Sequence, residues 1–237
     1  KTQDTPAALE GLRAAGWRDG PVFCAQNGVE NERMALRVFP NVHGINVLMP
    51  ASFAAVDEVN AFSTPRHGIF DVGRFPEGVD DDDAAMAEAL TAGNVAGFAD
   101  PAVMAAKYGK LLLNLNNVVG AALGFGARDG AIRRALRAEA ETVYAAAGIV
   151  WRDVGGNDPR RTEMMRQAEI PGVAKMGSST AQSLLRGAGS VETDYLNGEI
   201  ALLGRLHGVA TPVNEHMTAL GARLARVGAQ PGDTKVE

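Results

Sequence analysis

A lysine and two asparagines stand at helical spacing inside an otherwise apolar stretch. Lys110, Asn114 and Asn117 are surrounded by leucines at 111–113 and valines at 118–119. On one continuous α-helix the three polar side chains would share one face. Burying such groups costs free energy unless they are partnered, and a buried lysine changes its pKa readily. The pattern is compatible with general acid chemistry by Lys110, and equally with a lysine that reaches solvent beside amides bonded to the backbone.

A polar block also follows an early strand-like segment. Residues 26–32 read Gln-Asn-Gly-Val-Glu-Asn-Glu and come directly after the apolar segment 22–25. Asn-Gly is by itself an ordinary turn signal. At the carboxyl end of a Rossmann-type strand, however, such a turn lies where ligands bind.

Three more polar blocks lie in the last third of the chain. They read Ser-Ser-Thr-Ala-Gln, Glu-Thr-Asp-Tyr-Leu-Asn-Gly and Gly-Val-Ala-Thr-Pro-Val-Asn, at 178–182, 192–198 and 208–214. Glu192 has a plain structural interpretation, because Ser190 could cap a helix and place this carboxylate in the first turn. A functional role for Glu192 is compatible with that interpretation.

In this combination and order, the blocks resemble the ketopantoate reductase family. The family's motifs are Lys-x-x-x-Asn behind an aromatic residue, Gln-Asn-Gly-x-x-Asn-Glu, Ser-x-x-Gln, Thr-Glu-x-Asp-x-x-Asn-Gly and Gly-Val-x-x-Pro-x-Asn. In the fourth of them, Val191 stands in the place of the threonine. The resemblance covers nearly the whole chain. The sequence departs from the family at Tyr108, where tryptophan is more usual, at Val118, where some members have asparagine, and at Ser183, where aspartate is usual.

The resemblance implies a role for each matching residue. Lys110, rather than Lys107, would be the general acid that protonates the substrate carbonyl oxygen. Glu192 would lie beside the cofactor and the substrate hydroxyl, and would therefore serve both catalysis and cofactor binding. The remaining residues would bind the substrate (Asn114, Asn117 and Ser179) or the nicotinamide cofactor (Lys1, Asn27 and Ala51).

The composition excludes several other classes of function. The 237 residues carry a net charge of -5, which disfavours nucleic-acid binding because that requires a basic surface. No window of about eighteen apolar residues occurs, so we expect no membrane span. Cys24 is the only cysteine, which excludes an intrachain disulfide and favours a reducing cytoplasm. The four histidines have no metal-ligand spacing, and we expect no metal.

The segments that must position these residues fall into two parts. Residues 1–100 alternate helix-like and strand-like segments, with strands expected at 22–25, 42–48, 68–72 and 94–98 and a helix start at the aspartates 80–83. This alternation predicts an α/β domain, which the resemblance identifies as a Rossmann NADP-binding domain. Residues 101–237 predict an all-α substrate and catalytic domain, by resemblance of the 6-phosphogluconate-dehydrogenase-like type. Its helices are expected at 101–123, 129–147, 160–168, 179–186, 190–207 and 212–227.

The glycine fingerprint of a dinucleotide-binding domain is absent from the sequence. Gly124-Phe125-Gly126 follows a predicted helix rather than a strand, so it does not qualify. Either the chain binds no dinucleotide, or the segment that does so precedes Lys1. Alignment with the family places roughly seventy residues there, so we expect an incomplete Rossmann domain.

The resemblance implies NADP(H)-dependent reduction of 2-dehydropantoate (ketopantoate), or of a related 2-keto acid, as in pantothenate biosynthesis. It also implies a cytoplasmic homodimer whose other partner is the small-molecule substrate. Two alternatives stay open: another oxidoreductase of the 3-hydroxyacid-dehydrogenase group, and a helical interaction module without catalysis. The blocks around Asn27 and Glu192 argue against the first alternative.

Overall fold

The chain divides into two compact units. The computed structural model describes residues 1–124 and 129–234. Phe125 and Gly126 of the segment Gly124-Phe125-Gly126 lie outside these residues. The α/β unit contains Lys1–Lys110 and Trp151–Lys175, and the helical unit contains Leu111–Val150 and Met176–Glu237. The predicted fold class, a Rossmann-type α/β part with a helical part, is confirmed. The division into domains 1–100 and 101–237 stays a prediction. Each compact unit consists of two separate segments of the chain, so the units do not correspond to a single boundary.

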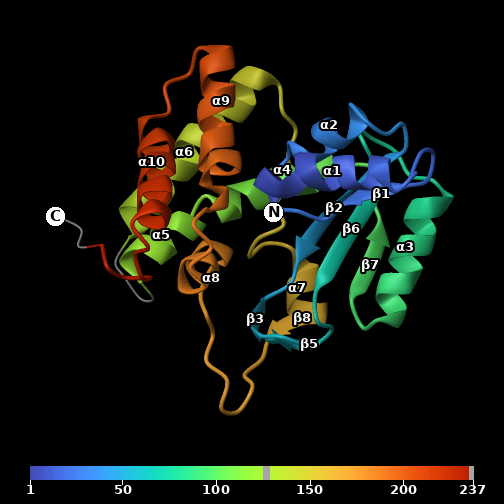
Figure 1. Ribbon diagram of the computed structural model, residues 1–237, viewed down its shortest axis with the longest axis horizontal. Coiled ribbons are helices and arrows are strands. Elements are labelled where there is room, and N and C mark those ends of the chain that lie inside the picture. The colour runs from blue at the N-terminus through green and yellow to red at the C-terminus, as the bar shows by residue number, and fades with distance from the viewer. Residues whose placement is uncertain (125–128, 235–237) are drawn as a thin grey trace. The chain divides into compact units, whose positions relative to one another are not determined.

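Four strands form the central sheet of the α/β unit, in the order β1-β2-β6-β7 (Figure 1). β1 (Val22–Cys24) runs parallel to β2 (Val42–Leu48). β6 (Ile69–Arg74) is antiparallel to β2, and β7 (Ala96–Ala99) is parallel to β6. All four correspond to predicted strands. Because β1 and β2 are parallel, their carboxyl ends lie at the same edge of the sheet.

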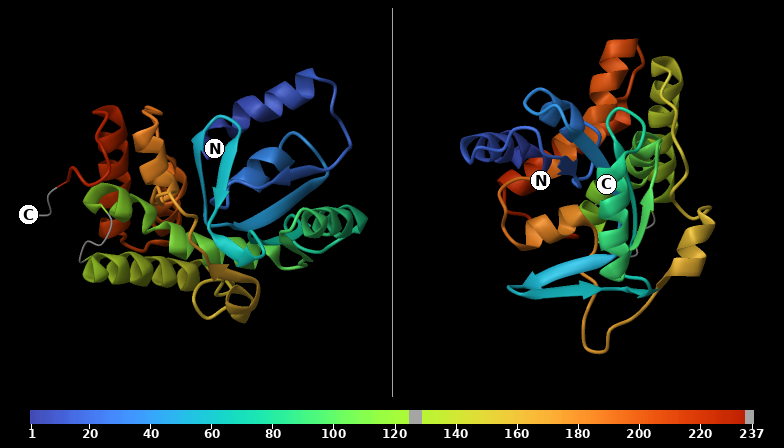
Figure 2. Two further views of the ribbon diagram at one scale, coloured as in Figure 1. Left: turned by 90° about the horizontal axis from the view of Figure 1, so that it is seen from below. Right: turned by 90° about the vertical axis from the view of Figure 1, so that its right-hand side faces the viewer.

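Helices cover this sheet and bury its apolar residues. Leu9 of α1 and Ala35 of α2 pack with Val22 and Val42, which lie opposite each other in β1 and β2. The left view of Figure 2 shows α1 and α3 on opposite sides of the strands. The helical segments here are the 3-10 helix η1 (Thr2–Asp4), α1 (Thr5–Ala14), α2 (Asn31–Leu36) and α3 (Asp81–Ala92).

Two short antiparallel pairs complete the α/β unit. β3 (Ala51–Ala55) pairs with β4 (Glu58–Ala61), and β5 (Ser63–Pro65) pairs with β8 (Met165–Gln167). The predicted helix over 160–168 is wrong in its second half, because α7 (Pro159–Met164) stops where β8 begins. β8 forms by pairing with a strand far earlier in the chain, which local periodicity does not encode.

The helical unit has a core to which several helices contribute. Leu136, Val143 and Tyr144 of α6 are buried, as are Ile200 and Leu203 of α9, which packs against both α6 and α10. None of the helices among the described residues is long and apolar enough to cross a bilayer. The elements are α5 (Asn117–Leu123), α6 (Gly130–Ala147), α8 (Ser179–Leu185), the 3-10 helix η2 (Glu192–Tyr195), α9 (Asn197–His207) and α10 (Pro212–Arg226).

The predicted helix over 101–123 is wrong as a single element. α4 (Val103–Asn114) ends first, and α5 begins only at Asn117. In the break, the carbonyl of Leu115 accepts a hydrogen bond from Asn197 Nδ2 at 3.2 Å. A side chain therefore uses a carbonyl that a continuous helix would have paired within its own ladder. Lys110 and Asn114 therefore lie on α4 and Asn117 lies on α5, so Asn117 does not share the helix face that was predicted for all three residues.

Asparagines from two of the late polar blocks hold the helical unit together. Asn197 and Asn214 are fully buried, and Asn197 Nδ2 donates to Asn214 Oδ1 at 3.2 Å. Asn214 Nδ2 donates in turn to the carbonyl of Leu136 and to Glu139. The Glu139 carboxylate also accepts the backbone N–H groups of Val213 and Asn214, which lie in the first turn of α10 and lack partners within the helix. These asparagines therefore have a structural role.

Candidate active site

A small pocket lies in the α/β unit at the edge where β1 and β2 end. It is lined by the turn after β1, the second half of β2 and two lysines of α4: Gln26, Asn27, Gly28, Ile45, Asn46, Val47, Lys107 and Lys110. The carboxyl ends of parallel strands are where α/β proteins bind ligands. The structure thus brings together Asn27 and Lys110, which the sequence motifs assign to a cofactor contact and to the general acid.

Residues near the start of the chain hold the turn after β1. The Asn27 carbonyl accepts hydrogen bonds from Thr2 Oγ1 at 3.1 Å and from Asn31 Nδ2 at 3.0 Å. Gln26 Nε2 donates to Thr5 Oγ1 at 3.1 Å. Within the described part of the chain, the side-chain amide of Asn27 has no hydrogen-bond partner, so it is available to a ligand.

Two more predicted cofactor residues lie close to this edge. Lys1 directly precedes Thr2, the residue that donates to the Asn27 carbonyl, and is the N-cap of η1. Ala51 is the first residue of β3 and comes shortly after the end of β2. Lys1, Asn27 and Ala51 are therefore all associated with the carboxyl edge of the sheet.

Lys107 is buried and fully engaged. Its Nζ donates to the carbonyls of Cys24 at 3.1 Å and Gln26 at 3.2 Å, and it forms an ion pair with Oε1 of Glu32. An ammonium group has three donors, so Lys107 has none left for a ligand. Burial, together with the charge of Glu32, raises the pKa of the Cys24 thiol to about 12, which keeps that thiol uncharged.

Lys110 lies one helical turn further along α4 and is only partly buried. Its Nζ donates to the Val47 carbonyl near the end of β2, which holds the ammonium group at the pocket. The geometry therefore favours Lys110 over Lys107 as the lysine that can meet a ligand. The spacing of the sequence motif leads to the same choice.

In the helical unit, two of the predicted substrate-binding residues contact each other. Asn117 Nδ2, at the start of α5, donates to Ser179 Oγ, at the start of α8, at 3.3 Å. Ser178 caps α8 by accepting the N–H of Ala181, and donates to the Asn117 carbonyl at 2.8 Å. Asn117 and Ser179 therefore present an amide and a hydroxyl side by side, a pair that can bind a carboxylate or a hydroxyl group.

Asn114 and Glu192 are both buried in the structure. Nδ2 of Asn114 has no hydrogen-bond partner among the described residues, and such a donor costs about 1–3 kcal/mol unless something binds it. Glu192 begins η2, where Val191 is the N-cap and no side chain caps the helix. The predicted helix over 190–207 is therefore wrong in its first part and in its cap by Ser190, because η2 comes first and α9 begins only at Asn197.

A family model described as "Ketopantoate reductase PanE/ApbA C terminal" matches residues 102–224, more than half of the chain. The chain belongs to the ketopantoate reductase family. This family is one of oxidoreductases that act on 2-keto acids.

Solved structures of ketopantoate reductases share the fold. A PanE/ApbA family ketopantoate reductase from Ralstonia eutropha JMP134 is 27% identical, with a TM-score of 0.74 over 96% of this chain and 74% of that one. A 2-dehydropantoate 2-reductase from Methylococcus capsulatus is 22% identical, with a TM-score of 0.72 over 94% and 76%. D-mandelate dehydrogenase in complex with NADH is 21% identical, with a TM-score of 0.73 over 96% and 76%.

Asn46 is a residue of the candidate site that the sequence motifs did not indicate. Asn46 is buried and lines the pocket with Lys110, and its Nδ2 donates to Asp71 at 3.0 Å. Its Oδ1 has no hydrogen-bond partner in the part of the chain that the structure describes. The only signal in the sequence was an amide inside the apolar strand 42–48.

An arginine–aspartate network lines a second pocket, of about 420 Å³. Asp71 of β6 is 1% exposed, and Arg160 Nη1 donates to it at 2.6 Å. Arg160 also pairs with Asp158 at 2.8 Å, and Arg152 pairs with Asp100. Because these carboxylates are already paired with arginines, the network fixes the segment after α6 to the sheet, and we assign it a structural role.

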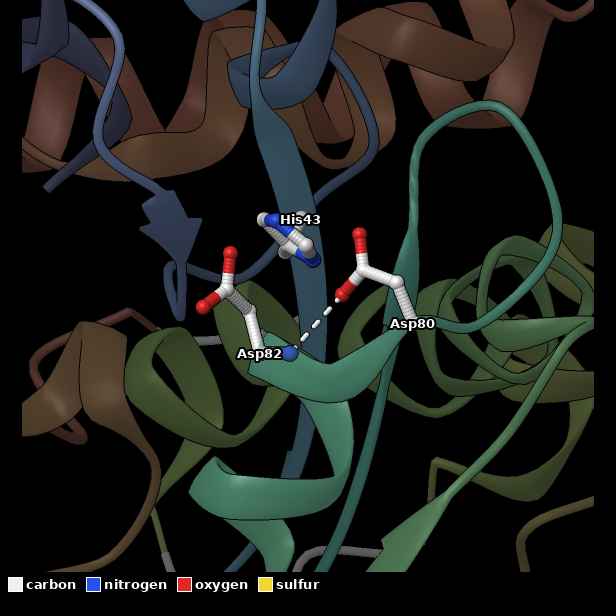
Figure 3. A group of neighbouring side chains, drawn as sticks. All are labelled: His43, Asp80 and Asp82. Atoms are coloured by element: carbon white, nitrogen blue, oxygen red, sulfur yellow. Dashed lines mark hydrogen bonds between the residues drawn. The ribbon is translucent and has the colours of Figure 1, made fainter.

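His43, Asp80 and Asp82 form a cluster (Figure 3). Each offers one nitrogen or carboxylate oxygen of a kind that can bind a metal, and these atoms lie within 4.8 Å of one another. Both ring nitrogens of His43 are hydrogen-bonded, one of them to Asp83 at 2.7 Å. Asp80 accepts the backbone N–H groups of Asp82 and Asp83 and pairs with Arg74. The acidic run therefore starts α3, as the sequence predicts, and the structure shows that it does so with a capping box.

We expect Asp80→Ala to lower the free energy of unfolding by about 1 kcal/mol, because α3 loses its N-cap. Burial alone would raise the pKa of Asp80, but hydrogen bonds from Arg74 and from the Asp83 backbone lower it below the ordinary value. A group with a lowered folded-state pKa stabilises the protein above its unfolded pKa of about 3.9. That contribution is lost as the pH falls through the folded-state pKa.

Denaturant unfolding from pH 7 downward measures this effect. Asp81→Ala is the control, because Asp81 is exposed in the same first turn and is not the cap. The difference between wild type and Asp80→Ala should shrink in acid. An equal loss in both variants at pH 7 would contradict the assignment of the cap.

Proposed function

We propose that this chain belongs to an enzyme that reduces ketopantoate, or a closely related 2-keto acid, to the 2-hydroxy acid with NADPH. The observation that carries the proposal is the pocket at the carboxyl edge of β1 and β2, which both Lys110 and Asn27 line. Membership of the ketopantoate reductase family supports the reaction type. The 27% identity to a ketopantoate reductase from Ralstonia eutropha supports the substrate class.

The chemistry of the carboxyl edge fits a nicotinamide cofactor. Asn27 offers an amide that has no hydrogen-bond partner among the described residues, and Lys1 offers a positive charge beside the same turn. We assign cofactor binding to these two residues, to Ala51 and to Glu192. The cofactor, when bound, supplies the hydride. The related D-mandelate dehydrogenase was solved with NADH, so the preference for NADPH rests on the family.

Lys110 is the proposed general acid. Reduction of a ketone adds a hydride to the carbonyl carbon and a proton to the carbonyl oxygen. Lys110 Nζ, held at the pocket by the Val47 carbonyl, would donate that proton, and its charge would stabilise the developing alkoxide. Lys107 is unsuited to this role because its three donors are already engaged.

Residues of the helical unit are proposed to bind the substrate. Asn117 and Ser179, which contact each other, would hold its carboxylate or hydroxyl groups, together with Asn114. The buried, unpartnered Nδ2 of Asn114 supports this assignment, because a ligand would satisfy it. Glu192 would orient the reacting hydroxyl group.

The full-length protein is expected to oxidise NADPH only when ketopantoate or a close 2-keto acid is present. A panel of ketopantoate, pyruvate and benzoylformate, each with NADPH and with NADH, measured by the loss of cofactor absorbance, tests this. Benzoylformate is included because D-mandelate dehydrogenase shares the fold. Oxidation of 3-hydroxy acids with no reduction of any 2-keto acid would contradict the proposal and favour the alternative oxidoreductase.

The proposal includes a homodimer in the cytoplasm. A ketopantoate reductase from Staphylococcus aureus that shares this fold is dimeric. Sedimentation of the full-length protein should give twice the monomer mass at assay concentrations, and a monomer that is fully active would contradict the dimer.

A further inference from the structure

We propose that the buried pair of Lys107 and Glu32 is a positioning device, which holds the turn after β1 so that Asn27 meets the cofactor at the pocket of Lys110. The inference rests on the proposed function. It assigns a role to two charged residues that the reaction itself does not use.

The pair joins three elements at one point. Lys107 comes from α4, Glu32 comes from α2, and the other two donors of Lys107 reach the carbonyls of Cys24 and Gln26. Cys24 is the last residue of β1, and Gln26 immediately precedes Asn27. Lys107 therefore fixes the backbone on the side where the chain enters the turn.

The far side of the turn is fixed as well. The Asn27 carbonyl is held by Thr2 and Asn31, and Thr5 holds Asn31 through a hydrogen bond of 2.8 Å to Oδ1. The carbonyls of Gln26 and Asn27 are thus both bonded, whereas the side chain of Asn27 has no hydrogen-bond partner among the described residues. Its direction is then set by the backbone on either side of it.

The same helix carries the tether and the proposed acid. Lys107 and Lys110 are one turn apart in α4, so a bond from Lys107 to the Gln26 carbonyl fixes the distance between the turn and Lys110. A reacting geometry shifted by about 1 Å can cost as much as a hundredfold in rate. A tether at this point therefore bears directly on the relative placement of Asn27 and Lys110.

Stability alone does not account for a charged pair at this place. Side chains of Lys107 and Glu32 are 3% and 0% exposed, and a buried ion pair is commonly no more stabilising than apolar residues of similar volume. The sheet also makes room for the pair: a Cβ on Gly44 of β2 would lie 3.3 Å from Glu32 Oε1 and 3.5 Å from Lys107 Cδ. What an apolar pair could not supply is the two hydrogen bonds to the backbone of the turn.

The test compares Lys107→Met with the double variant Lys107→Met/Glu32→Gln in the full-length protein. The single variant leaves Glu32 buried and uncompensated, so it should unfold at a lower temperature. The double variant leaves no buried charge, and should regain most of that loss. Both variants lack the tether, so both should show a KM for NADPH raised by about tenfold or more, with a smaller change in the KM for the keto acid.

Amide hydrogen exchange at Asn27 and Gly28 gives a readout that does not depend on activity. Exchange should be faster than wild type in both variants, including the stable double variant. Val143→Ala, a cavity variant in the core of the helical unit, is the control for lost stability and should leave the KM for NADPH and the exchange of the turn unchanged. If the double variant recovers a wild-type KM and wild-type exchange, the pair only compensates charge, and the inference is wrong.

The design separates this inference from the proposed function. A wild-type protein that oxidises no NADPH with any keto acid would contradict the proposed function, and hydrogen exchange would still decide whether Lys107 holds the turn. An active wild type with unaltered exchange in both variants would overturn the inference alone.

Discussion

Lys110→Ala is expected to lower the turnover of the full-length enzyme by about a hundredfold or more, because positioned general acids typically contribute about 10²–10⁴-fold. The effect should fall mainly on kcat, since the proton reaches the carbonyl oxygen only in the transition state. Steady-state kinetics with ketopantoate and NADPH measure it. A small primary amine added to the assay should restore part of the activity, because it can occupy the space of the deleted side chain.

The control for Lys110→Ala removes a positive charge elsewhere. Arg205→Ala is suitable, because Arg205 lies on α9 with its side chain 67% exposed and pairs with Glu215. This variant should have wild-type turnover. An unchanged turnover of Lys110→Ala would show that another group donates the proton, and the proposed mechanism would then fail.

Gly109→Ala should destabilise the protein by about 3 kcal/mol, the upper part of the usual range for overpacking. A Cβ on Gly109 would lie 1.7 Å from the carbonyl oxygen of Arg152 and 2.8 Å from its carbonyl carbon. Both are backbone atoms, and the N–H of Arg152 is bonded to the carbonyl of Ala105 in the same helix. The methyl group must therefore push α4 and the segment at Arg152 apart. Thermal unfolding should show a melting temperature lower by roughly 6–12 °C.

Gly120→Ala is the matched control for this prediction. Gly120 lies within α5, and a Cβ there would meet no atom within 4 Å. Alanine in a helix is favoured over glycine by roughly 0.5–1 kcal/mol, so this variant should be as stable as wild type or slightly more stable. Equal melting temperatures for the two variants would contradict the close approach at Gly109.

Much of the fold could be predicted because its signals are local. The alternation of short apolar runs indicated β1, β2, β6 and β7, and the acidic run at Asp80 indicated the start of α3. Two of the errors occur where a distant residue decides the backbone. Asn197 takes the carbonyl of Leu115 and ends a helix that apolar periodicity would continue, and β8 exists only because it pairs with β5.

The sequence motifs proposed residues of the candidate site, but they could not indicate which residues hold them in place. Motif spacing selected Lys110 over Lys107, and the proposal of Lys110 is supported by the donors of Lys107, which are occupied by Glu32 and two carbonyls. Nothing in the sequence pairs Lys107 with Glu32, because the two are far apart in the chain. Likewise, no motif in the sequence indicated that Asn46, a polar residue in an apolar strand, would line the pocket.

The return of the segment 151–175 to the α/β unit has a consequence for biosynthesis. During translation, Asp71 emerges from the ribosome long before Arg160, which neutralises it in the finished protein. A nascent chain that stops before residue 150 lacks both arginines that pair with this carboxylate, Arg152 and Arg160. The α/β unit is therefore completed only after α6 and α7 have both been made, and until then proteases or chaperones would meet it without the segment 151–175.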